Sequence, residues 1–354
     1  MTDLAVFETV QRDLVEVLRA FEDAQQDIRF QDIAGTQQAL RQRLGTTLDD
    51  IYSYTEAARN SGAENDVHET FFACVSLLQE AITYFLSSGG WPEFATAYMS
   101  SRQRQCQALE RLYLGLHNWP QLSAYFSIGD QPTPPSTATA AEGSALTHVG
   151  RSDSHHDYSL YVPETYDPQK RYPLIVALHG GYGRGDEYIW TWMRIARSRE
   201  MILLAPKSVG STWSIVQPPL DGQSILTAMD SVTSGYSIDS SKILLSGLSD
   251  GATFSFLLGL EHADRFAALA PIAGVLSPNV DHFLRAKAAL ELPIHVVHGV
   301  HDAIFPVQTA RSFTTLMSQL GYQLKYTELP DWGHALTYRI NETLILPWFD
   351  DIIT

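Results

Sequence analysis

The sequence has few basic residues and no long hydrophobic run, and each shortage excludes a class of protein. Acidic residues number 40 against 24 lysines and arginines, so the formal net charge is -16. Such a chain is repelled by nucleic-acid phosphates and by anionic lipid surfaces. No stretch approaches the roughly 20 apolar residues that a membrane span requires. We therefore expect neither nucleic acid as a partner nor a membrane-spanning segment.

Cysteine is also scarce. Cys74 and Cys106 are the two thiols of the chain, and both lie in helix-like patterns. This favours reduced, buried side chains, with a structural disulfide as the alternative, and neither cysteine resembles a metal ligand. The first residues mix acidic and apolar side chains at helical spacing, whereas a secretory signal needs a basic start and an unbroken apolar run. We expect a cytoplasmic protein.

The length of 354 residues leaves room for two domains. Up to residue 128, apolar residues recur three and four positions apart, which predicts an all-α accessory domain of four or five helices. Residues 129–145 are rich in Pro, Thr, Ala and Ser without periodicity and are typical of a linker. The helical domain carries no signature of its own. Oligomerisation, giving a homo-oligomer, and a substrate-covering lid are both open roles for it.

Residues 146–354 alternate short apolar runs with helical patterns. Unbroken apolar strands separated by helices predict an α/β domain with a mainly parallel sheet covered on both faces. In such sheets, ligands bind beyond the carboxyl ends of the strands. The expected strands are 158–162, 173–180, 201–206, 242–247, 267–274, 293–299 and 325–329.

One of these junctions holds the pattern Gly-x-Ser-x-Gly. Residues 242–247 read as a buried strand and residues 250–266 as a helix, so Ser249 lies in the turn between them. In that context the pattern predicts a nucleophile elbow, in which the glycines leave room for a tight turn and the serine hydroxyl stands above the sheet. A plain tight turn is the structural alternative.

A serine hydroxyl needs a base and an acid that orients the base. In this type of domain the acid follows the serine and the histidine follows the acid. Asp302 directly follows an apolar strand, and His334 is the single histidine downstream of it. Three other acids, Asp264, Asp281 and Asp331, are rivals that do not directly follow a core strand.

Acyl transfer also needs donors for the developing oxyanion. The amide of Asp250 lies next to the serine, and the second donor should come from the loop after an early strand. The segment His179-Gly180-Gly181 occupies that loop, so Gly181 is our candidate and Tyr182 its rival. A flexible turn would explain the glycines equally well.

Several side chains near these loops have less specific patterns. Tyr182, Trp213 and Trp332 lie in or beside the predicted catalytic loops and are candidates for an apolar substrate cleft, although core packing explains each one as well. His295, His298 and His301 fall three apart, but a strand turns alternate residues to opposite faces. They cannot all converge on one ion, so we expect no metal site there. We also expect no cofactor.

Together the segments "LHGGYGRG", "GLSDGA", "HGVHDAIFPV" and "WGHA" resemble the α/β-hydrolase superfamily, particularly its phospholipase/carboxylesterase, polyhydroxybutyrate-depolymerase-like and feruloyl-esterase-like branches. The resemblance covers residues 146–354. It implies an α/β-hydrolase fold and metal-free cleavage of a small-molecule carboxylic ester through an acyl-enzyme. Ser249, Asp302 and His334 match the triad positions. Ala252 departs from the pattern, because many relatives carry glycine there.

Three other activities are compatible with the same motifs. A serine peptidase or an acyl thioesterase of this fold would use the same triad, and a non-catalytic binding module would carry the elbow without reacting. Comparison of ester, thioester and peptide substrates separates the first two from an esterase. A fluorophosphonate probe distinguishes an enzyme from the binding module, because the binding module does not react with it.

Overall fold

The computed structural model describes residues 3–60, 66–87, 91–129, 145–151, 155–280 and 283–354. They divide into two compact units, which we call the helical unit (Met1–Ala138) and the sheet unit (Thr139–Thr354). Of the predicted linker, residues 130–144 lie outside the described residues.

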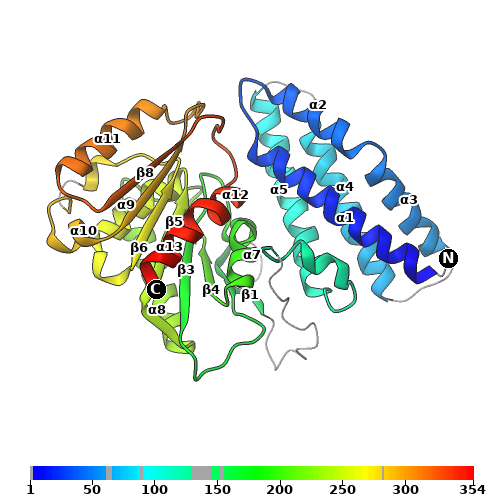
Figure 1. The fold of residues 1–354 in the computed structure, drawn as a ribbon, viewed down its shortest axis with the longest axis horizontal. Coiled ribbons are helices and arrows are strands. Elements are labelled where there is room, and N and C mark those ends of the chain that lie inside the picture. Colours follow the sequence, from blue (N-terminus) through cyan, green and yellow to red (C-terminus); the bar gives the residue numbers. More distant parts are fainter. Residues whose placement is uncertain (1–2, 61–65, 88–90, 130–144, 152–154, 281–282) are drawn as a thin grey trace. The chain divides into compact units, whose positions relative to one another are not determined.

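The helical unit contains five α-helices and a short 3-10 helix, and no strand occurs in its described residues (Figure 1). Gly45 divides a continuous apolar pattern into two helices, because its φ of 52° ends α2 in a conformation that other residues avoid. The elements are α1 (Asp3–Gln26), α2 (Ile33–Leu44), α3 (Thr47–Asn60), α4 (Asp66–Phe85), α5 (Trp91–Leu114) and η1 (Pro120–Ala124).

Aromatic side chains form the core of the helical unit. Phe85 contacts Phe21 and Phe94 edge-on, and Phe71 contacts Trp119 in the same way. Cys74 and Cys106 are both buried and form no disulfide, as predicted.

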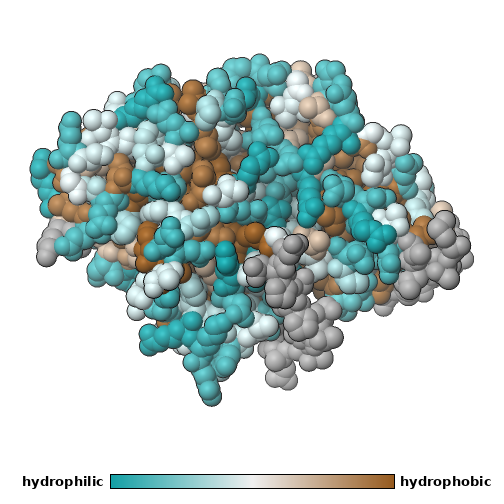
Figure 2. All heavy atoms as spheres, in the orientation of Figure 1, coloured by the Kyte–Doolittle hydropathy of each residue, from teal (hydrophilic) through white to brown (hydrophobic). Residues whose placement is uncertain are grey.

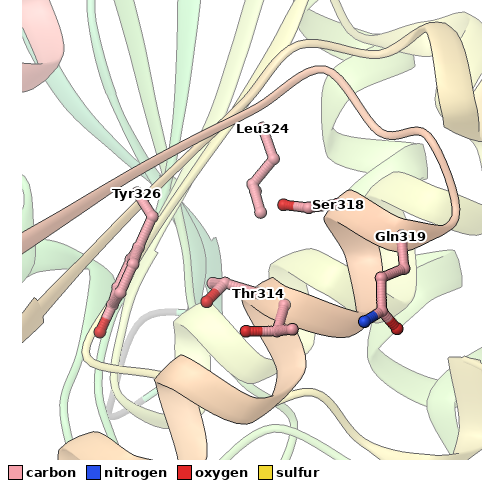
Figure 3. A pocket seen from close by; sticks show the side chains of 6 residues that line it. Thr314, Ser318, Gln319, Leu324 and Tyr326 are labelled. Atoms are coloured by element: carbon pink, nitrogen blue, oxygen red, sulfur yellow. The ribbon is translucent and has the colours of Figure 1, made fainter.

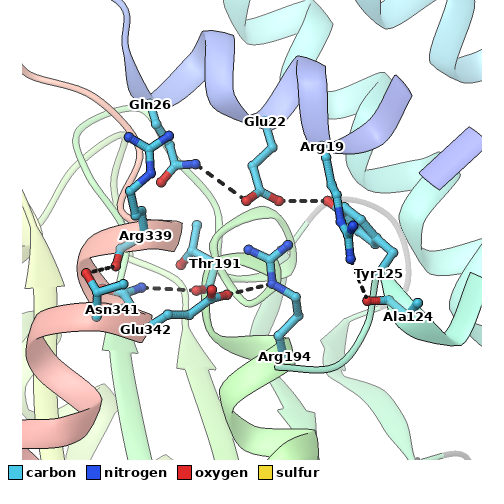
Figure 4. Close-up of polar contacts among 11 residues, drawn as sticks. Arg19, Glu22, Gln26, Ala124, Tyr125, Thr191, Arg194, Arg339, Asn341 and Glu342 are labelled. Atoms are coloured by element: carbon cyan, nitrogen blue, oxygen red, sulfur yellow. Dashed lines mark hydrogen bonds and ion pairs between the residues drawn. The ribbon is translucent and has the colours of Figure 1, made fainter. Parts of the chain in front are cut away.

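Polar contacts join the same helices. The Tyr125 hydroxyl donates to Glu22 Oε2 at 3.0 Å, and the Gln26 amide donates to Glu22 Oε1 at 3.4 Å (Figure 4). The carboxylate of α1 thus bonds both within its own helix and to the segment that follows η1.

The sheet unit is built on eight strands in the order β1-β2-β4-β3-β5-β6-β7-β8. The pairs β1/β2 and β2/β4 are antiparallel, and all the other pairs are parallel. This order, with helices between the parallel strands, is the α/β-hydrolase fold predicted from the sequence. The strands are β1 (Leu146–Arg151), β2 (His155–Tyr161), β3 (Tyr172–Leu178), β4 (Ile202–Pro206), β5 (Ile238–Leu248), β6 (Ala268–Ile272), β7 (Ile294–Gly299) and β8 (Leu324–Leu329).

Helices cover both faces of this sheet (Figure 1). On one face, β3 residues Leu174 and Val176 pack in one buried cluster with Ile225 of α8, Phe254 of α9 and Phe313 of α11. The helices of the sheet unit are α6 (Gly185–Tyr188), α7 (Trp190–Ser198), α8 (Pro218–Gly235), α9 (Asp250–Glu261), η2 (Ala263–Arg265), η3 (Pro278–Val280), α10 (Lys287–Glu291), α11 (Val307–Gln319), α12 (Tyr338–Ile340), the π-helix η4 (Asn341–Ile345) and α13 (Leu346–Ile353).

The opposite face of the sheet is covered by α7 and the C-terminal helices. His295 of β7 contacts the Trp348 ring of α13 at 5.1 Å. Two contacts join α7 to η4 (Figure 4). The Asn341 side-chain amide donates a hydrogen bond to the Thr191 carbonyl at 3.0 Å, and Arg194 forms an ion pair with Glu342 at 2.6 Å. These bonds fix the C-terminal helices on α7.

On the face drawn in Figure 2, hydrophobic residues are interspersed among hydrophilic ones. Among the described helices, none is both long enough and apolar enough to cross a membrane.

Candidate active site

Ser249 lies between the last residue of β5 and the first residue of α9. Its backbone has φ 58° and ψ -120°, a conformation that costs a non-glycine residue on the order of 1–3 kcal/mol. The Ser249 amide donates to the Ile272 carbonyl of β6 at 2.9 Å, which helps to hold the turn. Ser249 follows the carboxyl end of β5, the position at which the sequence predicts a nucleophile elbow, and we call residues 247–251 the elbow.

Close backbone packing explains the two glycines of the elbow. A Cβ on Gly247 would lie 2.3 Å from the Gly251 carbonyl oxygen, and a Cβ on Gly251 would lie 2.4 Å from the Leu178 carbonyl oxygen. Both contacts are with backbone atoms, which cannot move aside cheaply. The elbow therefore packs directly against the end of β3.

Asp302 and His334 are brought together although 32 residues separate them. Asp302 follows β7, His334 follows β8, and their Oδ2 and Nδ1 atoms are 2.7 Å apart. The other carboxylate oxygen of Asp302 accepts the amides of Ile304 and Phe305, both at 2.8 Å. The Asp302 side chain has no exposed surface and the His334 side chain is 9% exposed. Among the rival acids, Asp264 lies in η2 beyond the far end of α9, and Asp281 lies outside the described residues.

A second histidine, which sequence reasoning did not assign to the site, lies against the same acid. His298 Nε2 is 3.5 Å from Asp302 Oδ2 and 2.7 Å from the Phe305 carbonyl oxygen, to which it donates. Burial lowers the pKa of His298, which keeps the ring neutral. His295 of the same strand instead bonds to the Thr327 hydroxyl at 2.9 Å. The histidine spacing in the sequence carried no signal of this contact with the acid.

The two candidate oxyanion loops also meet at the elbow. A Cβ on Gly181 would lie 2.6 Å from Asp250 Oδ2, so the two loops are in direct contact. The Tyr182 amide donates to the Ser211 carbonyl at 2.8 Å, whereas the Gly181 amide has no hydrogen-bond partner among the described residues. Asp250 is the first residue of α9, where an amide has no partner within the helix. This geometry favours Gly181 over Tyr182 as the second donor.

The three aromatic candidates differ in exposure. Tyr182 is 71% exposed, Trp332 is 8% exposed and Trp213 is 1% exposed. Trp213 stacks on Phe254 and its Nε1 donates to the His179 carbonyl at 2.7 Å. Because both its face and its polar atom are used internally, we assign Trp213 to the support of the adjacent loop rather than to substrate contact.

Two hollows lie elsewhere in the sheet unit. One, of about 460 Å³, lies between α11 and β8 and is lined by Thr314, Thr315, Ser318, Gln319, Leu324 and Tyr326 (Figure 3). The other, of about 190 Å³, lies between α8 and α9. Neither includes a candidate catalytic residue.

Residues 224–345 match the model of the Phospholipase/Carboxylesterase family, and this segment contains Ser249, Asp302 and His334. The chain is similar to a bifunctional acetylxylan esterase/xylanase of Neocallimastix patriciarum, with 32% identity over 164 residues that cover 44% of this chain and 23% of the relative. The chain thus spans less than a quarter of that protein. It is also similar to a probable feruloyl esterase C of Aspergillus niger, with 26% identity over 198 residues, 54% of this chain and 70% of the relative.

Among solved structures, the chain is similar to an acetyl xylan esterase from Aspergillus awamori. The TM-score is 0.48 and the identity 17%, over 59% of this chain and 99% of that one. A thermostable esterase has a TM-score of 0.47 and 22% identity, over 58% of this chain and 63% of that one.

Proposed function

The sheet unit has the α/β-hydrolase fold, and from that premise we propose that this protein is a serine hydrolase that cleaves carboxylic esters through an acyl-enzyme. The observation that carries the proposal is the 2.7 Å contact between Asp302 and His334, which come from separate loops at the same end of the sheet as Ser249. The names of the relatives, which are esterases, support the same chemistry.

In the proposed reaction, Ser249 Oγ attacks the ester carbonyl carbon while Nε2 of His334 accepts the hydroxyl proton. Asp302 accepts a hydrogen bond from Nδ1–H of His334, which fixes the tautomer with a free Nε2 lone pair and stabilises the imidazolium that forms. The amides of Gly181 and Asp250 donate to the oxyanion of the tetrahedral intermediate. His334 then protonates the leaving alcohol, and a water molecule hydrolyses the acyl-enzyme by the same steps.

The relatives' names suggest a substrate class for this chain. The two names refer to acetylated xylan and to the feruloyl group, and we propose an ester of a sugar hydroxyl with a small or aromatic acyl group. A panel of aryl acetate, methyl ferulate, acetylated xylan, acyl thioester and peptide separates this class from thioesterase and peptidase activity. A cytoplasmic location and oligomerisation through residues 1–128 stay predictions of the sequence.

The test of the nucleophile is Ser249→Ala. We expect a fluorophosphonate to label the peptide that contains Ser249, and the substitution to abolish labelling and to lower kcat by about 10⁴-fold or more. Ser241→Ala is the matched control, because Ser241 is an exposed residue of the same strand, and it should react normally. Labelling of another serine, or full activity of the Ser249→Ala protein, contradicts the proposal.

A further inference from the structure

The loop that follows β4, residues 207–217, connects the two halves of the proposed oxyanion site. We call it the β4 loop. It is not one of the segments that supply the nucleophile, the acid, the base or a proposed oxyanion donor. Its hydrogen bonds nevertheless reach the residues on both sides of Gly181 and also Asp250.

On one side, the β4 loop holds the segment that carries Gly181. The Ser208 amide donates to His179 Nε2 at 3.1 Å, and Trp213 Nε1 donates to the His179 carbonyl at 2.7 Å. The Ser211 carbonyl accepts the Tyr182 amide at 2.8 Å. Gly181 is therefore flanked by His179 and Tyr182, which are both bonded to the same loop.

The state of His179 fits these bonds. Burial lowers its pKa to about 4, so the ring is neutral near pH 7. Nδ1 lies 2.7 Å from the Gly180 carbonyl oxygen, to which it donates, which leaves Nε2 as the acceptor for Ser208. A protonated ring would present a second donor to the Ser208 amide and break this bond.

On the other side, the β4 loop holds the elbow. Thr212 Oγ1 donates to Asp250 Oδ2 at 2.5 Å. The same carboxylate oxygen lies over Gly181, 2.6 Å from the position that a Cβ would take. One loop thus fixes the residue that carries the first proposed donor and the neighbours of the second.

Asp221 of α8, which lies outside the proposed site, binds the β4 loop at two points. Its side chain is fully buried, and its two oxygens accept the amides of Val209 and Ser214, each at 2.7 Å. The carboxylate lies in the first turn of α8, where the helix dipole favours a negative charge. It holds both ends of the segment that contains Ser211, Thr212 and Trp213.

We propose that Asp221 is a positioning residue for the oxyanion site, which it aligns through the β4 loop. This inference rests on the proposed ester hydrolysis. Asp221 does not touch the reacting atoms; it sets the relative position of the Gly181 and Asp250 amides. A misplacement of about 1 Å in such a site costs about 10²-fold in rate.

The experiment uses Asp221→Asn in the full chain. The amide group of asparagine can accept only one of the two loop amides and turns a donor toward the other, so the loop is released at one end. We expect kcat for an aryl acetate to fall about 10- to 100-fold, with little change in KM. Asp230→Asn is the matched control, because Asp230 lies on the same helix, is 63% exposed at its side chain and pairs with Arg265 on the surface.

A merely structural role is separated by comparing an ester with the matching thionoester. Sulfur accepts hydrogen bonds more weakly than oxygen, so the ester gains more than the thionoester from well-aligned oxyanion donors. The rate for the ester divided by the rate for the thionoester therefore reports the alignment of these donors. We expect Asp221→Asn to lower this ratio about 10-fold, and Thr212→Val, which leaves the Asp221 contacts intact, to lower it in the same direction. Partial unfolding would lower both rates equally and leave the ratio unchanged.

The outcomes are distinct. An unchanged ester to thionoester ratio in folded Asp221→Asn and Thr212→Val proteins overturns the role of the loop. If Asp221→Asn does not fold, Thr212→Val alone decides, because its side chain is only partly buried. Absence of ester hydrolysis in the unmodified protein, or its persistence in Ser249→Ala, overturns the proposed function instead.

Discussion

At the scale of single residues, burial lowers the pKa of three histidines of the sheet unit below its usual value. His179 bonds the β4 loop, His298 bonds the turn after Asp302, and His295 bonds Thr327 between two strands. His179 bonds through both ring nitrogens, and His298 and His295 each bond through Nε2. Protonation would add a charge that burial disfavours, so these residues tie the stability of the sheet unit to pH.

The unfolding free energy should therefore decrease in mild acid. Burial lowers the pKa of His179 and His295 to about 4, whereas an unfolded histidine titrates near 6.5. Between these values the unfolded chain binds more protons, so stability falls as the pH drops from about 6.5 toward 4, by up to about 1.4 kcal/mol per pH unit for each histidine. Urea unfolding at several pH values measures the slope.

His295→Gln is the informative variant, since glutamine can still bond to Thr327 but does not titrate. We expect a shallower dependence on pH than in the unmodified protein. His301→Gln, at an exposed position two residues beyond the same strand, should keep the original slope. An undiminished slope in the His295→Gln protein would contradict the assignment.

The sequence predicts the catalytic candidates better than their supports. Ser249, Asp302 and His334 each follow a recognisable strand and occur in a fixed order, so the local pattern suffices to select them. Asp221 and His298 act on groups 12 and 7 residues away, through a folded loop and a turn. No local pattern reports those contacts, because each depends on where the loop backbone comes to lie.

At the scale of elements, seven strands of the sheet follow the apolar runs of the sequence, whereas β1 was not predicted. The β1 sequence "LTHVGR" is short, mixes polar with apolar residues and lies at the edge of the sheet, where one neighbour suffices. A bulge between Val149 and Gly150 interrupts its pairing with β2. Strands buried between two neighbours, such as β4 and β6, are apolar throughout and are therefore visible in the sequence, whereas the mixed pattern of β1 does not distinguish it from a loop.

The contact of the elbow with β3 leads to a prediction about Gly251. An added Cβ would lie 2.4 Å from the carbonyl oxygens of both Leu178 and His179, so Gly251→Ala must displace backbone at the centre of the sheet. We expect a loss of about 3 kcal/mol in unfolding free energy, together with loss of ester hydrolysis. Thermal and urea unfolding measure the first effect.

Gly235→Ala provides the comparison. Gly235 is the last residue of α8, and an added Cβ there has no atom within 4 Å. Its unfolding free energy should change by less than about 1 kcal/mol. Equal stability of the two alanine variants would contradict this prediction, because it would show that the backbone around Gly251 accommodates a Cβ at little cost in free energy.

At the scale of the whole molecule, each unit has a core of its own. In the helical unit, Phe21, Phe71 and Trp119 are almost fully buried and make aromatic contacts with other residues of that unit. In the sheet unit, one cluster extends from Tyr158 to Tyr322 without a residue of the helical unit. All five residues of the proposed catalytic machinery belong to the sheet unit.

This division predicts that residues 145–354 alone hydrolyse a small activated ester. The shortened chain keeps Ser249, Asp302 and His334 together with the Gly181 and Asp250 amides, so kcat for an aryl acetate should stay within about 10-fold of the full chain. A cooperative thermal transition is the necessary control, because removal of a domain can expose apolar surface. If the shortened protein is folded but inactive, and adding residues 1–130 as a separate chain restores activity, then the helical unit contributes directly to the active site. That result would overturn its assignment as an accessory domain.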